Sequence, residues 1–231
     1  MKKIDIIILC GGLGTRIKSK SKNLPKILIE IQNKKPFILW LLKKLYSKRL
    51  NRIILSVGYR KQKLINFVKN NKNLDLSYCA ENTQLGTGGA IKNAIKKKNI
   101  SDPFIVVNGD TYFNFNIDIM INKYFSIKKN SFIMLKKSEK EKRYDQFAII
   151  NNKITKLEKK SKMNKFINAG LYLFHKRDFN IKKNKFSIEN IVIPNLIKNN
   201  QLSYFINKSK IFYDIGVPNS LRNFKNFIKK K

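Results

Sequence analysis

Cysteine, histidine and acidic residues are all scarce in this 231-residue sequence. It contains two cysteines and one histidine, which excludes a disulfide scaffold and a Cys/His zinc site of ordinary ligand count. No apolar run approaches the roughly 18–20 residues needed to span a bilayer. The apolar start of the chain is interrupted by Asp5 and followed by glycines, so it fits a buried strand better than a signal peptide. We expect a cytoplasmic protein without a membrane partner.

The shortage of acid leaves 50 Lys and Arg against 14 Asp and Glu, with a formal net charge of +36. Such a charge can indicate binding to nucleic acid or to an anionic membrane. Here the lysines are spread along the whole chain, and Arg, whose planar fork grips phosphates and stacks on bases, is scarce. We interpret the charge as compositional drift that would still attract nucleotides, and we expect no specific nucleic-acid partner.

The hydrophobic pattern predicts a single α/β domain. Strands are expected at 4–9, 52–57, 74–79 and 104–107, and helices at 36–46, 61–69 and 88–98. This alternation is typical of a doubly wound sheet. Further strands are expected at 132–135, 147–150, 154–157, 167–174 and 211–213, and helices at 188–198 and from 219. Because no linker or repeat interrupts the chain, we expect residues 1–231 to form one domain.

The strongest local signal is Leu9-Cys10-Gly11-Gly12-Leu13-Gly14-Thr15-Arg16, directly after the first predicted strand. Glycines there let backbone N–H groups approach phosphates closely, because no side chain blocks the approach. The run is neither a P-loop nor the dinucleotide fingerprint, since Ile17 stands where the third glycine would be. Arg16 adds a cation at the end of the loop, and Leu24-Pro25-Lys26 follows.

The combination Gly-Gly-x-Gly-Thr-Arg with a trailing Pro-Lys resembles the sugar-1-phosphate nucleotidyltransferase family. Further family-like segments follow in the expected order at residues 54–59, 85–91, 108–110, 168–172 and 213–218. Leu-Gly-Thr-Gly-Gly-Ala-Ile and Asn-Gly-Asp-Thr-Tyr-Phe look most like the guanylyltransferases that act on D-glycero-D-manno-heptose 1-phosphate. The resemblance implies a Rossmann-like mixed sheet of the nucleotide-diphospho-sugar transferase type.

It also implies the reaction. A nucleoside triphosphate, expected to be GTP, would give its nucleotidyl group to a sugar 1-phosphate and release pyrophosphate. The protein would act by positioning the groups and neutralising charge. The resemblance places the catalytic residues Arg16 and Lys26 on the pyrophosphate and near the α-phosphate. It gives Asp110 and Asp214 the role of holding Mg²⁺, which prefers carboxylates and water.

Two further sets of residues are implied to bind the substrates. The nucleotide set is Leu9, Gly11, Gly12, Gly14, Thr15, Gln84, Gly86 and Thr87. The sugar-phosphate set is Gly109, Glu158, Lys159, Asn168 and Gly170. Residues 1–130 would form the nucleotide-binding half, and residues 131–231 the sugar-phosphate-binding half. Lys160 stands where the family has Pro, and Asp145 follows Arg143-Tyr144 where the family has Gly.

Other interpretations stay open at this point. A uridylyl-, thymidylyl- or cytidylyltransferase acting on another sugar 1-phosphate or on phosphocholine would keep the fold and change the substrates. A basic nucleic-acid-binding protein would use the charge, but no zinc-finger, basic-zipper or RNA-binding aromatic motif supports it. A catalytically inactive relative is a third alternative. The presence of Arg16, Lys26, Asp110 and Asp214 together argues against it, because an inactive protein need not keep any of them. A homo-oligomer is possible, and we expect a minimal enzyme without a regulatory repeat domain.

Overall fold

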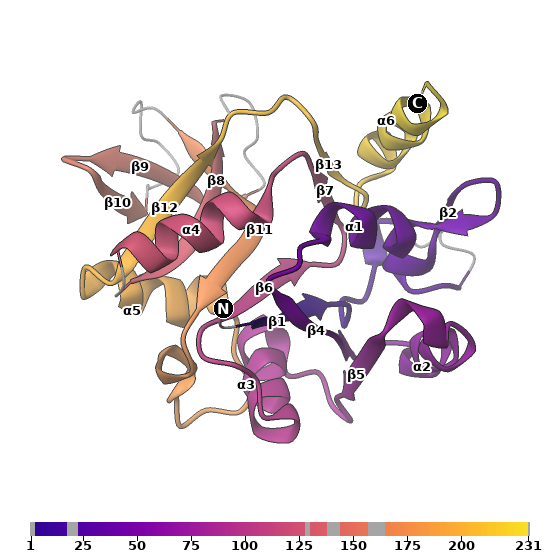
Figure 1. Ribbon diagram of the computed structural model, residues 1–231, viewed down its shortest axis with the longest axis horizontal. Helices are drawn as coiled ribbons and strands as arrows, with labels where there is room; N and C mark the ends of the chain where they lie inside the picture. The colour runs from indigo at the N-terminus through magenta and orange to yellow at the C-terminus, as the bar shows by residue number, and fades with distance from the viewer. Residues whose placement is uncertain (1–2, 18–22, 128–129, 138–143, 157–164, 231) are drawn as a thin grey trace.

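The computed structural model describes residues 3–17, 23–127, 130–137, 144–156 and 165–230, and its centre is a nine-stranded sheet (Figure 1). The strands of this sheet are β1 (Ile4–Leu9), β4 (Leu50–Val57), β5 (Leu76–Ala80), β6 (Phe104–Asn108), β8 (Ser131–Lys137), β9 (Gln146–Ile150), β10 (Lys153–Lys156), β11 (Phe166–Phe174) and β12 (Leu202–Asn207). Their main order is β10-β9-β11-β6-β1-β4-β5, with β8 beside β11 and β12 beside β8.

The sheet has a parallel and an antiparallel part, so it is mixed, as predicted. Strands β6, β1, β4 and β5 run parallel, and their carboxyl ends meet at one edge. Strand β11 pairs antiparallel with β6, β8 and β9. The hairpin from β9 to β10 turns at Asn151 and Asn152, whose φ angles of 47° and 58° suit a two-residue turn. In sheets of this kind, ligands bind outside the carboxyl ends of the parallel strands.

Helices cover both faces of the sheet. They are α1 (Phe37–Leu45), α2 (Lys61–Asn70), α3 (Gly86–Lys98), α4 (Ile117–Ile127), α5 (Ile193–Lys198) and α6 (Pro218–Lys229). One hydrophobic cluster joins α1, α2, α4 and α6 to Ile6 and Ile8 of β1, and a second joins α3 and α5 to Ile7. Successive side chains of a strand point to opposite faces. The apolar side chains of β1 are therefore buried on both sides, and the doubly wound fold is confirmed.

Some elements differ from the predicted pattern. Residues 188–198 form a π-helical turn, Ile188–Val192, followed by α5. The pattern predicts neither α4 nor β12. The start of α4 alternates apolar and polar residues like a strand, but Met120, Ile121 and Tyr124 are buried at helical spacing. Four short strands form two separate pairs, β2 (Glu30–Gln32) with β3 (Lys35–Pro36), and β7 (Thr111–Phe113) with β13 (Phe212–Asp214).

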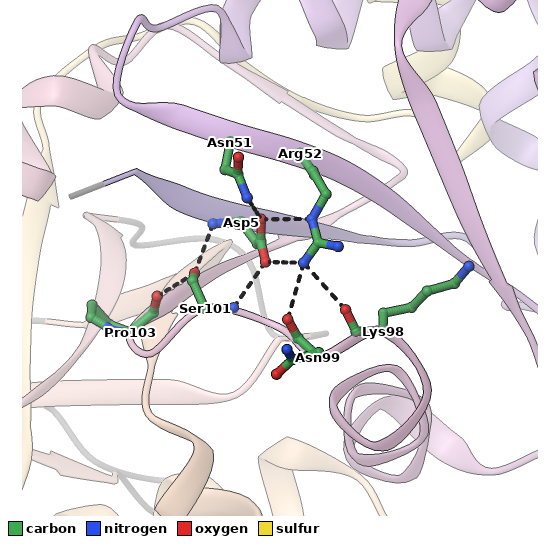
Figure 2. A network of polar contacts seen from close by, with 7 residues as sticks. All are labelled: Asp5, Asn51, Arg52, Lys98, Asn99, Ser101 and Pro103. Atoms are coloured by element: carbon green, nitrogen blue, oxygen red, sulfur yellow. Dashed lines mark hydrogen bonds and ion pairs between the residues drawn. The ribbon is translucent and has the colours of Figure 1, made fainter. Parts of the chain in front are cut away.

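A buried ionic network fastens the amino end of β1 (Figure 2). The side chain of Asp5 is 1% exposed and lies 2.7 Å from Nη2 of Arg52. It also accepts hydrogen bonds from the Asn51 side chain and the Ser101 backbone. The same Arg52 nitrogen donates to the carbonyl oxygens of Lys98 and Asn99 at the end of α3. The network thus ties β1, β4 and α3 together.

The helices are short. The longest in the described part of the chain, α3, has 13 residues, against about 20 for a membrane-spanning helix. Accordingly, none of the described helices combines the length and apolarity needed to cross a bilayer.

Candidate active site

A cavity of about 260 Å³ opens at the carboxyl ends of β1, β4 and β6. Its walls come from the loop after β1, the 3-10 turn Lys26–Leu28, the turn into α3 and the turn after β6. The lining residues are Leu9, Cys10, Gly11, Gly12, Lys26, Ile27, Ser56, Glu81, Gln84, Gly86, Thr87, Ala90, Asn108, Gly109 and Asp110. The fold therefore brings four predicted parts to one space: the glycine loop, Lys26, the segment from Gln84 to Thr87, and the Gly109-Asp110 turn.

The glycine loop turns back over Lys26. Gly14 has a φ of +66°, and a Cβ at this position would lie 3.4 Å from Cγ of Lys26. A glycine adopts this left-handed conformation without strain. Thr15 and Arg16 follow in a 3-10 turn, Thr15–Ile17, in which Arg16 is exposed and Ile17 is buried. The turn anchors the loop through Ile17 and leaves the Arg16 guanidinium on the surface.

Lys26, Asp110 and Asp214 converge at one point beside the cavity. Nζ of Lys26 lies 2.7 Å from Oδ2 of Asp110. A Cβ built on Gly216 would lie 2.8 Å from Oδ1 of Asp214, 3.0 Å from Nζ of Lys26 and 3.2 Å from Oδ2 of Asp110. These three predicted residues are far apart in the sequence, and the structure gathers them.

Backbone and side-chain contacts position the two aspartates. Asp214 ends β13, which pairs with β7 so that Asp214 lies opposite Thr111. The Ile215 N–H donates to the carbonyl of Asp110 at 2.8 Å. The Asp214 carboxylate accepts from the Gly216 N–H at 2.7 Å and from the Tyr144 hydroxyl at 2.8 Å. The pairing of β7 with β13 therefore fixes the carboxylates side by side.

The acidic pair matches the way Mg²⁺ is bound in nucleotide sites. Among the residues that the structure describes, no group of three or more His, Cys, Asp and Glu side chains could hold a metal ion. Mg²⁺ usually takes one or two carboxylates and completes its shell with water and substrate phosphates. Asp110 and Asp214, next to a glycine loop suited to phosphates, are the residues that could hold such an ion.

The cavity wall also contains a buried carboxylate. Glu81 directly follows β5 and is 8% exposed. Burial raises the pKa of this carboxyl group, against the effects of a hydrogen bond from the Leu85 N–H and of the Lys61 charge.

Gly86, with φ +74°, begins α3, and a Cβ there would lie 2.6 Å from the Phe186 carbonyl oxygen. This turn can therefore hold only a glycine at position 86 without rearrangement.

The predicted sugar segment lies on β11, next to the end of β6. Gly170 has a φ of +76°, and a Cβ there would lie 2.8 Å from Nδ2 of Asn108. The pairing of β11 with β8 is irregular between Asn168 and Tyr172, as at a β-bulge, and bulges re-aim side chains. Asn168 donates to the Tyr172 hydroxyl and accepts from the Gly170 N–H. Glu158 and Lys159 lie outside the described residues.

The sequence analysis missed three polar residues that the structure places at the site. Glu81 lines the cavity, Tyr144 binds Asp214, and Glu189 accepts from the Thr87 hydroxyl at 2.9 Å. Glu81 could have been found, because it is a carboxylate directly after a parallel strand in an acid-poor chain, as is Asp110. Glu189 gave no such signal, since it lies 102 residues from Thr87.

The doubly wound sheet, the glycine loop and the converging lysine and aspartates define an enzyme that handles nucleotide phosphates. The chain belongs to the nucleotidyl transferase family, whose model, described as "Nucleotidyl transferase", matches residues 5–231.

Several relatives share most of their length with this chain. It is 30% identical to the D-glycero-alpha-D-manno-heptose 1-phosphate guanylyltransferase of Aneurinibacillus thermoaerophilus, over 95% of this chain and 96% of the relative. It is 33% identical to the protein of the same name from Campylobacter jejuni, over 96% and 98%. The crystal structure of HddC from Yersinia pseudotuberculosis superimposes with a TM-score of 0.81 at 32% identity, covering 97% of this chain and 99% of HddC. HddC has also been crystallised in complex with GMP-PN.

Proposed function

We propose that this enzyme transfers GMP from GTP to D-glycero-α-D-manno-heptose 1-phosphate, forming GDP-heptose and releasing pyrophosphate. The observation that carries the proposal is the convergence of Lys26, Asp110 and Asp214 beside the cavity that contains Glu81. Relatives named as guanylyltransferases of this sugar phosphate support the choice of substrates, because they match this chain over nearly its whole length. An enzyme that uses two such substrates is expected to act in the cytoplasm.

The chemistry of Glu81 favours guanine. An ionised carboxylate only accepts hydrogen bonds, and guanine offers two neighbouring donors, N1–H and the 2-amino group. Uracil and thymine flank their single N–H with carbonyl oxygens, which a carboxylate repels. Cytosine and adenine present a ring acceptor beside the amino group. A two-oxygen acceptor in a buried position therefore pairs best with guanine, and charge-assisted bonds of this kind are strong.

The residues around the loop suit an in-line displacement at the α-phosphorus. The loop N–H groups would receive the phosphates of the triphosphate, and Arg16 and Lys26 would neutralise charge as it moves onto the leaving pyrophosphate. Asp110 and Asp214 would hold Mg²⁺, which would supply further neutralisation of phosphate oxygens. The hydrogen bond to Asp110 already holds the Lys26 ammonium group beside the glycine loop, where it would neutralise this charge.

We further propose that the single domain divides its substrates along the chain. Residues 1–130 would bind the nucleotide, since every residue that lines the cavity comes from this half. Residues 131–231 would bind the sugar phosphate through Asn168 and Gly170, of which Gly170 lies against Asn108 at the end of β6, and Gly109 would contribute from the turn that follows β6. Glu158 and Lys159 would contribute by the family resemblance alone.

Pyrophosphate release tests the proposal. GTP, UTP, CTP, dTTP and ATP would each be offered, with Mg²⁺, against heptose, mannose, glucose and amino-sugar 1-phosphates. We expect release with GTP and the heptose 1-phosphate. Release with a different pair would keep the reaction and reject the substrates. No release from any pair, with folded protein, would reject the reaction for this set of substrates.

A further inference from the structure

The hydroxyl group of Thr87 is held from two sides by the π-helical turn Ile188–Val192. It donates to Oε2 of Glu189 at 2.9 Å. It also accepts from the backbone N–H of Ile188 at 2.9 Å. Thr87 lies in the first turn of α3 and lines the nucleotide cavity, whereas the π-helical turn belongs to the other half of the chain. One threonine hydroxyl therefore joins the two halves at the cavity wall.

The contact is part of a rigid junction. The Phe186 N–H donates to the carbonyl of Leu85 at 2.9 Å, and the Phe186 carbonyl accepts from the N–H groups of Gly88 and Gly89 at 2.9 and 3.1 Å. A Cβ on Gly88 would lie 2.2 Å from the Phe186 ring, so the two segments pack without space between them. Because the backbones on both sides are fixed, the Thr87 hydroxyl cannot turn away from Glu189 without breaking its bond.

Glu189 is suited to hold one orientation of that hydroxyl. Burial raises the pKa of its carboxyl group, while hydrogen bonds from its own backbone N–H and from Thr87 lower it. Nearby Asp145 raises it further and Lys156 lowers it. At a pH at which the carboxyl group is ionised, it can only accept. The hydroxyl proton of Thr87 then has a fixed destination.

The count of bonds at Thr87 has a consequence for the substrate. A hydroxyl group has one proton to donate and two lone pairs to accept with. The hydroxyl proton is used in the hydrogen bond to Glu189, and one lone pair accepts from the Ile188 N–H. One lone pair is left, on a residue of the cavity wall. A substrate group that meets this oxygen must therefore be a hydrogen-bond donor.

We propose that Glu189 is a positioning residue that fixes Thr87 as a hydrogen-bond acceptor, so that Thr87 selects a donor group of the bound nucleoside. Two such groups have the required chemistry, the 2-amino group of guanine and a ribose hydroxyl. The inference rests on the proposed function for the identity of the base, but not for the role of Glu189.

Nucleotide analogues that lack one donor test this role. Dissociation constants would be measured by calorimetry at pH 8 with Mg²⁺, for GTP, ITP, 2′-deoxy-GTP and 3′-deoxy-GTP. ITP lacks the 2-amino group, and each deoxy nucleotide lacks one hydroxyl. In the unaltered protein we expect one of these analogues to bind roughly three- to tenfold more weakly than GTP, the range for one net hydrogen bond. In Thr87→Val, this difference should vanish.

The variants at position 189 separate positioning from support of the fold. Glu189→Met has no acceptor for the Thr87 proton, so the discrimination should fall towards one. Glu189→Gln keeps an amide oxygen that can accept and should retain it. A supporting role alone would weaken GTP and its analogues equally and leave their ratio unchanged. Glu30→Gln, on an exposed side chain of β2, is the matched control.

The outcomes are distinct from those of the proposed function. The inference fails if the unaltered protein binds all four nucleotides equally, if Thr87→Val or Glu189→Met keeps the discrimination, or if Glu189→Gln loses it as Met does. Should Glu189→Met not fold, Thr87→Val carries the test. If the protein binds UTP and not GTP, the guanine proposal fails, and the same ratios are measured with UTP and its deoxy forms.

Discussion

The ammonium group of Lys26 lies 2.7 Å from Oδ2 of Asp110, so the proposed catalytic cation and a proposed metal ligand partly neutralise each other. Both side chains keep contact with solvent, at 16% and 27% exposure. An ion pair in such surroundings contributes little to stability, of the order of 0–1 kcal/mol. The pair therefore positions both groups at the mouth of the glycine loop, yet a triphosphate with its cation can separate them.

Replacing Lys26 by Ala should lower turnover by roughly 10²–10³-fold, the scale for losing one preorganised charge donor. The fold should be retained, because the ion pair adds little stability. Steady-state kinetics and thermal unfolding would be compared with Lys44→Ala, which removes a lysine bonded to Asn114. Turnover like that of the unaltered protein would remove Lys26 from the mechanism.

Replacing Asp110 by Asn should abolish Mg²⁺-dependent activity, since an amide is a poor ligand for this ion compared with a carboxylate. The binding of Mg²⁺ together with GTP, followed by calorimetry, should weaken as well. Asp118→Asn, at the start of α4, is a suitable control. An unchanged requirement for the metal would mean that other groups hold it.

Replacing Glu81 by Gln should weaken the binding of GTP more than that of UTP, because one oxygen acceptor becomes a donor. The loss should be at least tenfold, on the scale of about 1.5–3 kcal/mol for hydrogen bonds to charged groups. The raised pKa of Glu81 adds a pH dependence. An exposed glutamate has a pKa of about 4.3. Glu81 should take up its proton at a higher pH than that, and the affinity for GTP should fall as this protonation occurs. The affinity of Glu81→Gln for GTP should not show this fall. If the variant and the unaltered protein have the same pH profile of GTP affinity, Glu81 does not bind the base.

Replacing Arg52 by Ala should destabilise the protein by about 2 kcal/mol, because it leaves Asp5 buried without its counter-ion. This value is lower than is typical for breaking a fully buried ion pair. The Arg52 side chain is 43% exposed, so water can replace part of its interaction with Asp5. Chemical denaturation at pH 7 measures the change. Similar stability would show that Asn51 and Ser101 suffice.

The pH dependence of this network has a defined sign. Burial alone would raise the pKa of Asp5, but the hydrogen bonds from Arg52, Ser101 and Asn51 lower it overall. The stabilisation is thus present above the pKa of an unfolded aspartate, about 3.9, and is lost as the pH falls through the folded-state value. The stability gap between the unaltered protein and Asp5→Asn should shrink below about pH 4.

Both cysteines should resist thiol reagents in the folded protein. Burial, aided by the charge of Asp110, raises the pKa of the Cys10 thiol far above its usual range, and burial also raises the pKa of Cys79. The thiolate is the reactive species. A colorimetric thiol titration should find no fast-reacting group before denaturation and two per chain afterwards. A fast reaction of either thiol under native conditions would contradict this burial.

Local patterns predicted most of the strands and helices in residues 1–130. Strand β1 was predicted with its observed bounds, because an apolar run broken only by Asp5, between charged and glycine-rich segments, has few alternatives. The glycine loop and Asp110 were predicted from their places just after predicted strands, and Lys26 from the family resemblance of the Pro25-Lys26 pair. The convergence of Asp214 with Lys26 could not be read from spacing, since it depends on the pairing of β13 with β7.

What the sequence did not predict is decided by long-range contacts. Helix α4 starts with the alternation of a strand, and the burial of its face against the sheet makes it helical. The π-helical turn at Ile188–Val192 is fastened to the start of α3, across a large sequence separation. Such contacts have no local periodicity, and they place Glu189 against Thr87 of the cavity wall.

The Asp5 network lies at the amino end of β1, and the glycine loop begins at its carboxyl end. The two are separated by four residues of strand, about 13 Å at the usual rise. Substitutions at Asp5 or Arg52 would thus change how much enzyme survives in a cell at growth temperature, while each surviving molecule keeps its catalytic constants. Abundance and activity can then be changed by separate mutations, at the amino end and at the carboxyl end of the same strand.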